Sequence, residues 1–130
     1  MSDFSKFQIM VYDWACNCFS SNIVENKNER NDRFLEEALE LVQSLDMPKA
    51  RAEKILNYVY SRGSGEPEQE AGGVGVTLSC LLSVNNISMG EAFALELERI
   101  SCPEAISKIR NKQNKKAVIG VGSYTSRKSK

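Results

Sequence analysis

The segment Arg30-Asn-Asp-Arg-Phe-Leu-Glu-Glu-Ala-Leu-Glu-Leu-Val-Gln-Ser-Leu45 carries the clearest secondary-structure pattern of the chain. At about 100° per residue, its apolar side chains gather on one side of a helix. These side chains are Phe34, Ala38, Leu41, Val42 and Leu45, flanked by Leu35 and Leu39. Glu36, Glu37 and Glu40 fall together on the opposite side in the same projection. The segment therefore predicts an amphipathic helix with an acidic face.

The segments on both sides of this one also carry helical signals. Helices are expected over residues 4–19, 48–62, 66–86, 88–101 and 101–116, with a polar Ser/Asn-rich loop over 20–28. Pro48 and Pro67 stand at favourable first-turn positions. Ser88 and Ser101 are each followed three residues later by a glutamate, which is the pattern of a capping box.

One segment, Val74 to Val84, is also compatible with a buried strand. A lone strand would have no partner elsewhere in the chain, and small residues on a helix let a neighbouring helix approach closely. We therefore predict a helix here too, and an all-α fold class. Long apolar faces on several short helices are hard to cover within 130 residues, which favours a fold completed by oligomerisation as a homodimer or homotetramer.

Length and hydropathy limit the organisation of the protein. With 130 residues the chain fits one domain, which we place at residues 1–116, followed by a basic flexible tail over 117–130. No apolar run approaches the roughly 20 residues that cross a bilayer, so no membrane is expected as a partner. The start, Met1-Ser-Asp-Phe-Ser-Lys, lacks the pattern of a secretory signal, and a cytoplasmic location is expected.

Histidine is absent, and there are four cysteines. The lack of histidine excludes Ser-His, Cys-His and HExxH chemistry together. Cys16, Cys18, Cys80 and Cys102 lack the Cys-x-x-Cys spacing of a zinc or redox site and are expected to be buried reduced thiols. Any catalysis must therefore use carboxylates, lysines, arginines and a metal ion.

The net charge is zero, but its distribution along the chain is uneven. Up to Glu104 there are 17 acids and 9 bases, and from Ala105 onward there are 8 bases and no acid. An acidic body with a basic end suits a site that holds divalent cations and meets anionic ligands. It is equally typical of a solubilising body with a disordered tail. Nucleic acid is not expected as a partner, because the tail lacks interleaved aromatics beyond Tyr124.

The acidic face predicts a metal site, with a solvated helix face as the alternative. Neighbouring like charges repel unless a cation lies among them, and Mg²⁺ prefers carboxylate oxygens. Glu37 and Glu40 are one helical turn apart, as are Glu66 and Glu70 at the start of a later helix. If these two helices pack antiparallel, Glu37, Glu40 and Glu70 can converge on a shared ion.

Two motifs of the chain resemble those of a known family. Arg33-Phe-Leu-Glu-Glu-Ala-Leu-Glu-Leu is similar to the EExxE motif of MazG-like nucleoside-triphosphate pyrophosphohydrolases, an all-helical superfamily that includes the dimeric dUTPases. Gln69-Glu-Ala-Gly-Gly-Val-Gly-Val-Thr-Leu falls where that family carries its ExxD motif. The resemblance covers about Val11 to Lys116.

The resemblance implies a MazG-like helical bundle and a reaction. The bundle would cleave a nucleoside triphosphate between its α and β phosphates, with Mg²⁺ or alternatively Mn²⁺ as cofactor, and release a monophosphate and pyrophosphate. Glu37 and Glu40 would be metal ligands of the first motif and Glu70 of the second. Glu36 would lie in the outer shell or act as the base for the attacking water. Gly73 stands where the family has its aspartate, so either Glu66 compensates or fewer metal ions bind.

Substrate contacts are expected from basic and aromatic side chains. Lys108, Arg110 and Lys112, together with Arg33, are candidates for the phosphates, although exposed cations are common. Trp14 is a candidate to stack on the base, although core packing is the more frequent fate of such a side chain. Two alternative functions remain. One is a nucleotide- or metal-binding module with little turnover, and the other is a helical protein–protein adaptor.

Overall fold

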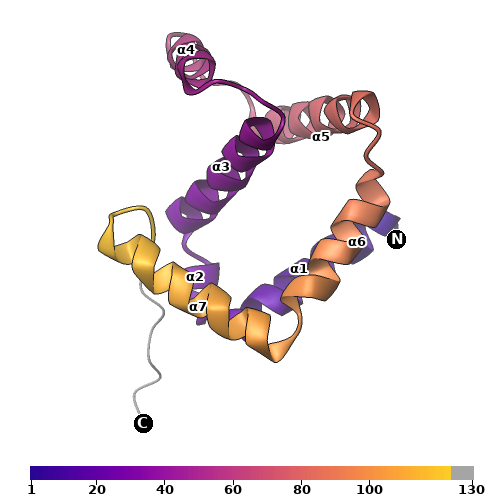
Figure 1. Ribbon diagram of the computed structural model, residues 1–130, viewed down its shortest axis with the longest axis vertical. Coiled ribbons are helices and arrows are strands. Elements are labelled where there is room, and N and C mark those ends of the chain that lie inside the picture. The colour runs from indigo at the N-terminus through magenta and orange to yellow at the C-terminus, as the bar shows by residue number, and fades with distance from the viewer. Residues whose placement is uncertain (124–130) are drawn as a thin grey trace. The chain divides into compact units, whose positions relative to one another are not determined.

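The computed structural model describes residues 1–123, and all regular secondary structure in this part of the chain is helical. Its helices, labelled in Figure 1, are α1 (Asp3–Cys18), α2 (Ser21–Val24), α3 (Lys27–Ser44), α4 (Lys49–Tyr60), α5 (Pro67–Val84), α6 (Met89–Ile100) and α7 (Pro103–Val118). The predicted all-α class is therefore confirmed. The segment Val74 to Val84, which could also have formed a strand, lies within α5.

The predicted loop over residues 20–28 is wrong in part. It contains the short helix α2, and α3 begins within it at Lys27. Serine and asparagine suggested a loop, but both residue types also favour the N-terminal ends of helices. Here the Asn26 side-chain oxygen accepts a hydrogen bond of 3.0 Å from the Glu29 backbone amide, which caps α3.

The two predicted capping boxes have different outcomes. The Glu91 amide donates to Ser88 Oγ at 3.3 Å, so the serine half of the first box is present. The box at Ser101 is wrong, because α7 begins only at Pro103 with Cys102 as its cap. The Ser101 hydroxyl instead donates to the Leu97 carbonyl of the preceding helix. Proline is well suited to the first helical position, and it moves the N-cap of α7 one residue beyond the predicted Ser101, to Cys102.

Three helices end in the same way, with a left-handed residue that reverses the chain. This residue is Asp46 (φ 69°) after α3, Asn86 (φ 56°) after α5 and Gly120 (φ 81°) after α7. In each case the next residue donates its amide back into the last helical turn. These bonds join Met47 to Val42 at 3.0 Å, Ile87 to Leu82 at 2.9 Å and Val121 to Lys116 at 3.0 Å. All three ends are Schellman motifs.

The chain divides into two compact units, which we describe separately. Unit 1 contains Met1–Ala38 and the chain from Glu96 onward, and unit 2 contains Leu39–Leu95. In unit 1, α1 contacts both α2 and α7. The buried apolar side chains of this unit lie in α1 and α2 and are Ala15, Cys18, Ile23 and Val24.

Two long side chains link the helices of unit 1. Arg110 of α7 donates to the carbonyls of Cys18, at 2.6 Å, and of Asn17, at 2.8 Å, which lie at the C-terminal end of α1. Trp14 of α1 donates from its indole nitrogen to the Ile100 carbonyl at 2.8 Å. Both contacts satisfy carbonyls at a helix end that have no partner inside their own helix.

Unit 2 buries very little of its apolar surface. It contains α4, α5, the end of α3 and the start of α6. Leu82 of α5 is its buried apolar side chain, and α4 has no buried residue. Ile55, Leu56 and Val59 share one face of α4 and are each 47–49% exposed.

The expected burial of the cysteines is wrong for three of them. Cys18 is buried, whereas Cys16, Cys80 and Cys102 are exposed, and all four are free thiols. Cys16 lies about 160° around α1 from Cys18, so one helix cannot turn both toward the same neighbour. Burial raises the pKa of the Cys18 thiol, and the nearby charge of Arg110 opposes this shift.

No single helix among residues 1–123 combines the length and the apolar character needed to cross a membrane. The helix pair α5 and α6 meets that test only when its two members are taken together, and it is bent at the break between them.

Candidate functional site

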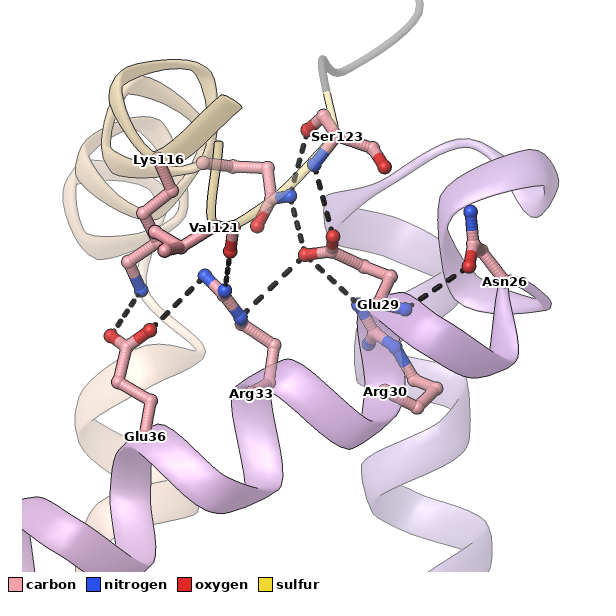
Figure 2. A network of polar contacts seen from close by, with 9 residues as sticks. Asn26, Glu29, Arg30, Arg33, Glu36, Lys116, Val121 and Ser123 are labelled. Atoms are coloured by element: carbon pink, nitrogen blue, oxygen red, sulfur yellow. Dashed lines mark hydrogen bonds and ion pairs between the residues drawn. The ribbon is translucent and has the colours of Figure 1, made fainter. Parts of the chain in front are cut away.

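A buried carboxylate, that of Glu29, lies in the first turns of α3. Glu29 is 2% exposed and accepts hydrogen bonds from the Gln113 side-chain amide of α7 and from the Ser123 backbone amide, the latter at 2.9 Å. Gln113 is buried too and also donates to the Ser123 carbonyl at 2.7 Å. Figure 2 shows Glu29 between α3 and the segment that follows α7. The carboxylate thus joins two parts of the chain that are distant in sequence.

Two arginines compensate the buried charge. Arg33 Nε lies 3.6 Å and Arg30 Nη2 lies 3.9 Å from Glu29 Oε1. Burial lowers the pKa of the Arg30 guanidinium, Glu29 opposes this shift, and the like charge of Arg33 adds to it. Arg33 also donates to the Val121 carbonyl, so one guanidinium binds both α3 and the C-terminal segment.

A second carboxylate, that of Glu36, continues the network. Lys116 Nζ lies 2.6 Å from Glu36 Oε1, and Arg33 Nη1 lies 3.3 Å from Glu36 Oε2. The side chains of Glu36 and Lys116 are 28% and 27% exposed, so the pair is largely shielded from solvent. The result is a continuous row of alternating charges, Glu29–Arg33–Glu36–Lys116, which we call the α3–α7 charge row (Figure 2).

Helical spacing and two glycines explain why the α3–α7 charge row forms. Glu29, Arg33 and Glu36 project within about 60° of one another on α3, and Gln113 and Lys116 are one turn apart on α7. Gly120 then reverses the chain. A Cβ added at Gly122 would lie 3.1 Å from Lys116 Cβ and 3.2 Å from Gln113 Nε2, so only glycine passes here without a shift of its neighbours.

The C-terminal segment contributes to this arrangement. Residues 117–130 were expected to form a flexible tail, yet α7 runs to Val118, and Val121 and Ser123 both bind the row. Residues 124–130 of the predicted tail lie outside the described part of the chain.

The α3 helix meets its surroundings in unit 1 through its polar side. Its charged face carries the row, whereas Phe34 and Leu35 on the apolar side are 56% and 52% exposed. The amphipathic pattern correctly predicted the helix. It did not predict which face would be covered.

The predicted metal ligands are exposed and lie in different units. Glu37 belongs to unit 1, and Glu40, Glu66 and Glu70 belong to unit 2. Glu66 is the N-terminal cap residue of α5, and Glu70 lies in its first turn, where the carboxylate approaches Gly65. Within residues 1–123 no group of three or more Cys, Asp or Glu side chains is arranged to hold a metal ion.

The predicted substrate contacts fall into two groups. Lys108 and Lys112 are exposed on α7. Arg33 is bound within the charge row, and Arg110 binds α1. Trp14 donates to Ile100 and packs edge-on against Phe19, with ring centroids 6.4 Å apart. These last three side chains thus have contacts within the chain, and all five substrate roles remain predictions.

Sequence reasoning missed several members of the network. Lys116 entered the predictions only as the end of a helix and of the resemblance, and Glu29, Gln113 and Ser123 were not among the predicted site residues. The spacing of Glu29, Arg33 and Glu36, with opposite charges at i, i+4 and i+7, was a usable signal. Nothing in the sequence pointed to the partners from α7. The hydrogen bond between Gln113 and Glu29, for example, joins residues more than 80 positions apart.

Comparisons with protein-family models, curated proteins and solved structures find no significant match for this chain. Over residues 1–123, fold and site therefore define an all-α protein with a buried, charge-compensated carboxylate at the start of an acidic helix.

Proposed function

We propose that the protein is a magnesium-dependent nucleoside-triphosphate pyrophosphohydrolase, which converts a triphosphate into a monophosphate and pyrophosphate. The observation that carries the proposal is the acidic motif on α3. Glu37 and Glu40 are both exposed and stand one turn apart on one continuous helix. This spacing allows two hard carboxylate ligands to reach the same Mg²⁺ ion.

The donor set fits a magnesium ion in chemistry, but the two carboxylates of α3 do not complete a site. Mg²⁺ takes one or two protein carboxylates and fills its remaining positions with water and phosphate oxygens. Glu70 and Glu66 of α5 are the next candidates, from the same chain or from a second copy. Gly73 stands where the family carries aspartate and provides no ligand. We therefore assign the role of that missing ligand to Glu66.

The chain's own residues would bind and orient the substrate. Lys108 and Lys112 expose ammonium groups on α7 that can bind the phosphates. Trp14 is the candidate to contact the base. A bound Mg²⁺ would neutralise phosphate charge and acidify the attacking water. None of these steps requires histidine.

We further propose that the protein works as a homodimer or homotetramer. The support comes from apolar side chains that the chain leaves uncovered. Phe34 and Leu35 on α3 and the Ile55–Leu56–Val59 face of α4 are about half exposed. Exposed apolar patches of this kind mark surfaces that bind another protein.

The decisive experiment is turnover of a nucleotide panel with Mg²⁺, measured as pyrophosphate release. Glu37→Gln and Glu40→Gln should each lower kcat/KM by at least about a hundredfold, because removing a metal ligand removes transition-state stabilisation. The melting temperature should stay near that of the wild type, because both side chains are exposed. Asp32→Asn, an exposed acid on the same helix, is the matched control and should leave turnover unchanged.

The same assay separates the alternatives. Nucleotide binding without turnover would favour a binding module, in line with the glycine at position 73. Neither binding nor turnover would favour a helical protein–protein adaptor, for which the exposed face of α4 is the supporting observation.

A further inference from the structure

We infer that two copies of the chain associate through α5, with their two α5 helices antiparallel across a two-fold axis. The inference rests on the oligomer proposed above, whose contact it names, and not on nucleotide hydrolysis. The face concerned, which we call the α5 seam, consists of Gln69, Gly73, Val76, Cys80 and Ser83.

The α5 seam is exposed in the described part of the chain. α5 lies wholly within unit 2, and Leu82, its one buried residue, projects about 140° away from the seam. All five seam residues are exposed, Val76 at 72%. They follow one another in steps of four and three residues, which is the spacing at which two paired helices meet. The seam thus has the pattern of a helix pair without a partner among residues 1–123.

The glycines of α5 indicate a close neighbour that residues 1–123 do not supply. Glycine destabilises the middle of a helix, and it is useful there where another backbone approaches closely. A Cβ added at Gly72, Gly73 or Gly75 would meet no described atom within 4 Å. Thr77, beside the seam, donates its hydroxyl to the Gly73 carbonyl at 2.8 Å, so this hydroxyl is satisfied without water.

The absence of charge on α5 identifies the neighbour as a second copy of the chain. Near a two-fold axis a residue lies opposite itself or a close neighbour, so a charged face would repel its own copy. From Ala71 to Val84 there is no charged residue on any side of α5. This stretch can therefore pack against itself without leaving a charge unpaired.

The acids of α5 select the antiparallel arrangement. Glu66, Glu68 and Glu70 all lie at the N-terminal end of the helix. Parallel helices would bring these acids of both copies together, and like charges in contact are unfavourable. Antiparallel helices instead place each acidic end beside the uncharged C-terminal half of the partner.

The antiparallel arrangement has a self-complementary register. With the two-fold axis beside Val76, the Cys80 side chain of each copy lies over Gly73 of the other, where the missing Cβ leaves room. The two Cys80 residues then lie about 10 Å apart along the pair, which is too far for a disulfide. Parallel helices in register would instead bring the two Cys80 thiols together.

The test is disulfide formation in the full-length protein, with diamide as the oxidant that accepts the two protons and two electrons of a thiol pair. Gly73→Cys should give a cross-linked dimer, because the introduced thiol faces Cys80 of the partner. Cys80 of the same chain lies about 10 Å along the helix and is out of reach. Adding Cys80→Ser to Gly73→Cys should therefore abolish the dimer.

A matched pair of variants, both made together with Cys80→Ser, controls for chance collisions. Val76→Cys places a thiol at the axis, opposite itself. Val74→Cys places one at an exposed position about 140° around the helix from the seam. Val76→Cys should cross-link at least about tenfold faster than Val74→Cys, because association raises the local concentration of its thiol.

Each outcome decides the inference. Cross-linking of Gly73→Cys and Val76→Cys, without a Cys80-dependent dimer of the wild type, supports the antiparallel α5 contact. A wild-type dimer that Cys80→Ser abolishes overturns it, because the two Cys80 thiols must then meet. If neither variant exceeds Val74→Cys, the inference is also overturned, and another part of the chain or a different protein covers α5. Light scattering of the wild type and turnover of the nucleotide panel test the proposed oligomer and the proposed hydrolysis separately.

Discussion

Glu29 shows how a buried charge is retained at the scale of one residue. Taking a carboxylate out of water costs several kcal/mol unless partners replace its hydration. Glu29 has two hydrogen-bond donors and two guanidinium groups within 3.9 Å, drawn from α3, α7 and the C-terminal segment. We therefore attribute the meeting of these three segments chiefly to this one side chain.

Glu29→Gln should lower the free energy of unfolding by about 2–4 kcal/mol, because it removes the negative charge opposite Arg33 and Arg30. The new amide would also turn a donor toward the Gln113 or Ser123 nitrogen, both of which are donors themselves. Urea denaturation followed by circular dichroism measures the loss. Glu98→Gln, an exposed glutamate on α6, should change stability by less than about 0.5 kcal/mol. Equal effects of the two substitutions would contradict the assigned role of Glu29.

At the scale of the element, local sequence determines where a helix ends better than it determines which face of the helix is covered. Three Schellman motifs stop α3, α5 and α7, and two of them use a residue other than glycine in the left-handed conformation. A Cβ in this conformation costs about 1–2 kcal/mol, somewhat less for aspartate and asparagine. The chain therefore contains strain that substitution can relieve.

Asp46→Gly should raise the free energy of unfolding by about 0.5–1 kcal/mol. Glycine adopts the φ of 69° without strain, and the substitution also removes a negative charge from the C-terminal end of α3. Thermal and urea denaturation measure the gain. The converse substitution, Gly120→Ala at a φ of 81°, should lower stability by about 1 kcal/mol. A loss of stability in Asp46→Gly would show that the aspartate side chain makes a contact that outweighs the strain.

At the scale of the whole molecule, few apolar side chains of residues 1–123 are buried within the two units. A domain of this size normally covers roughly two thirds of the surface that its unfolded chain exposes. Within residues 1–123 the buried apolar side chains are only Ala15, Cys18, Ile23, Val24 and Leu82. The remaining apolar surface is the physical reason for proposing a second copy of the chain.

We expect light scattering to give a mass of two or four times the 14.5 kDa of the monomer. Leu56→Lys should shift the protein toward the monomer, because it places a charge in the apolar face of α4. Asn57→Lys, which adds the same charge about 100° around the helix, should leave the mass unchanged. A monomeric wild type at all concentrations would contradict the proposed oligomer.

Local chemistry was enough to predict most of the helices. Periodicity placed α1, α3, α4, α5, α6 and α7 within a few residues of their ends, because apolar spacing, prolines and caps act over one or two turns. The error at Ser101 has the same local origin, because Pro103 competed for the helix start. The acidic motif and its spacing are likewise properties of one helix.

Tertiary structure decided everything that joins distant residues. Only the fold shows that Glu29 is buried, that Glu36 is held by Lys116, and that Val121 and Ser123 belong to the site. The amphipathic pattern of α3 could not reveal that Glu29, Arg33 and Glu36 on its polar side would be covered while Phe34 and Leu35 stay about half exposed. A helix pattern records which side chains share a face, whereas burial depends on which partner the rest of the chain brings to that face.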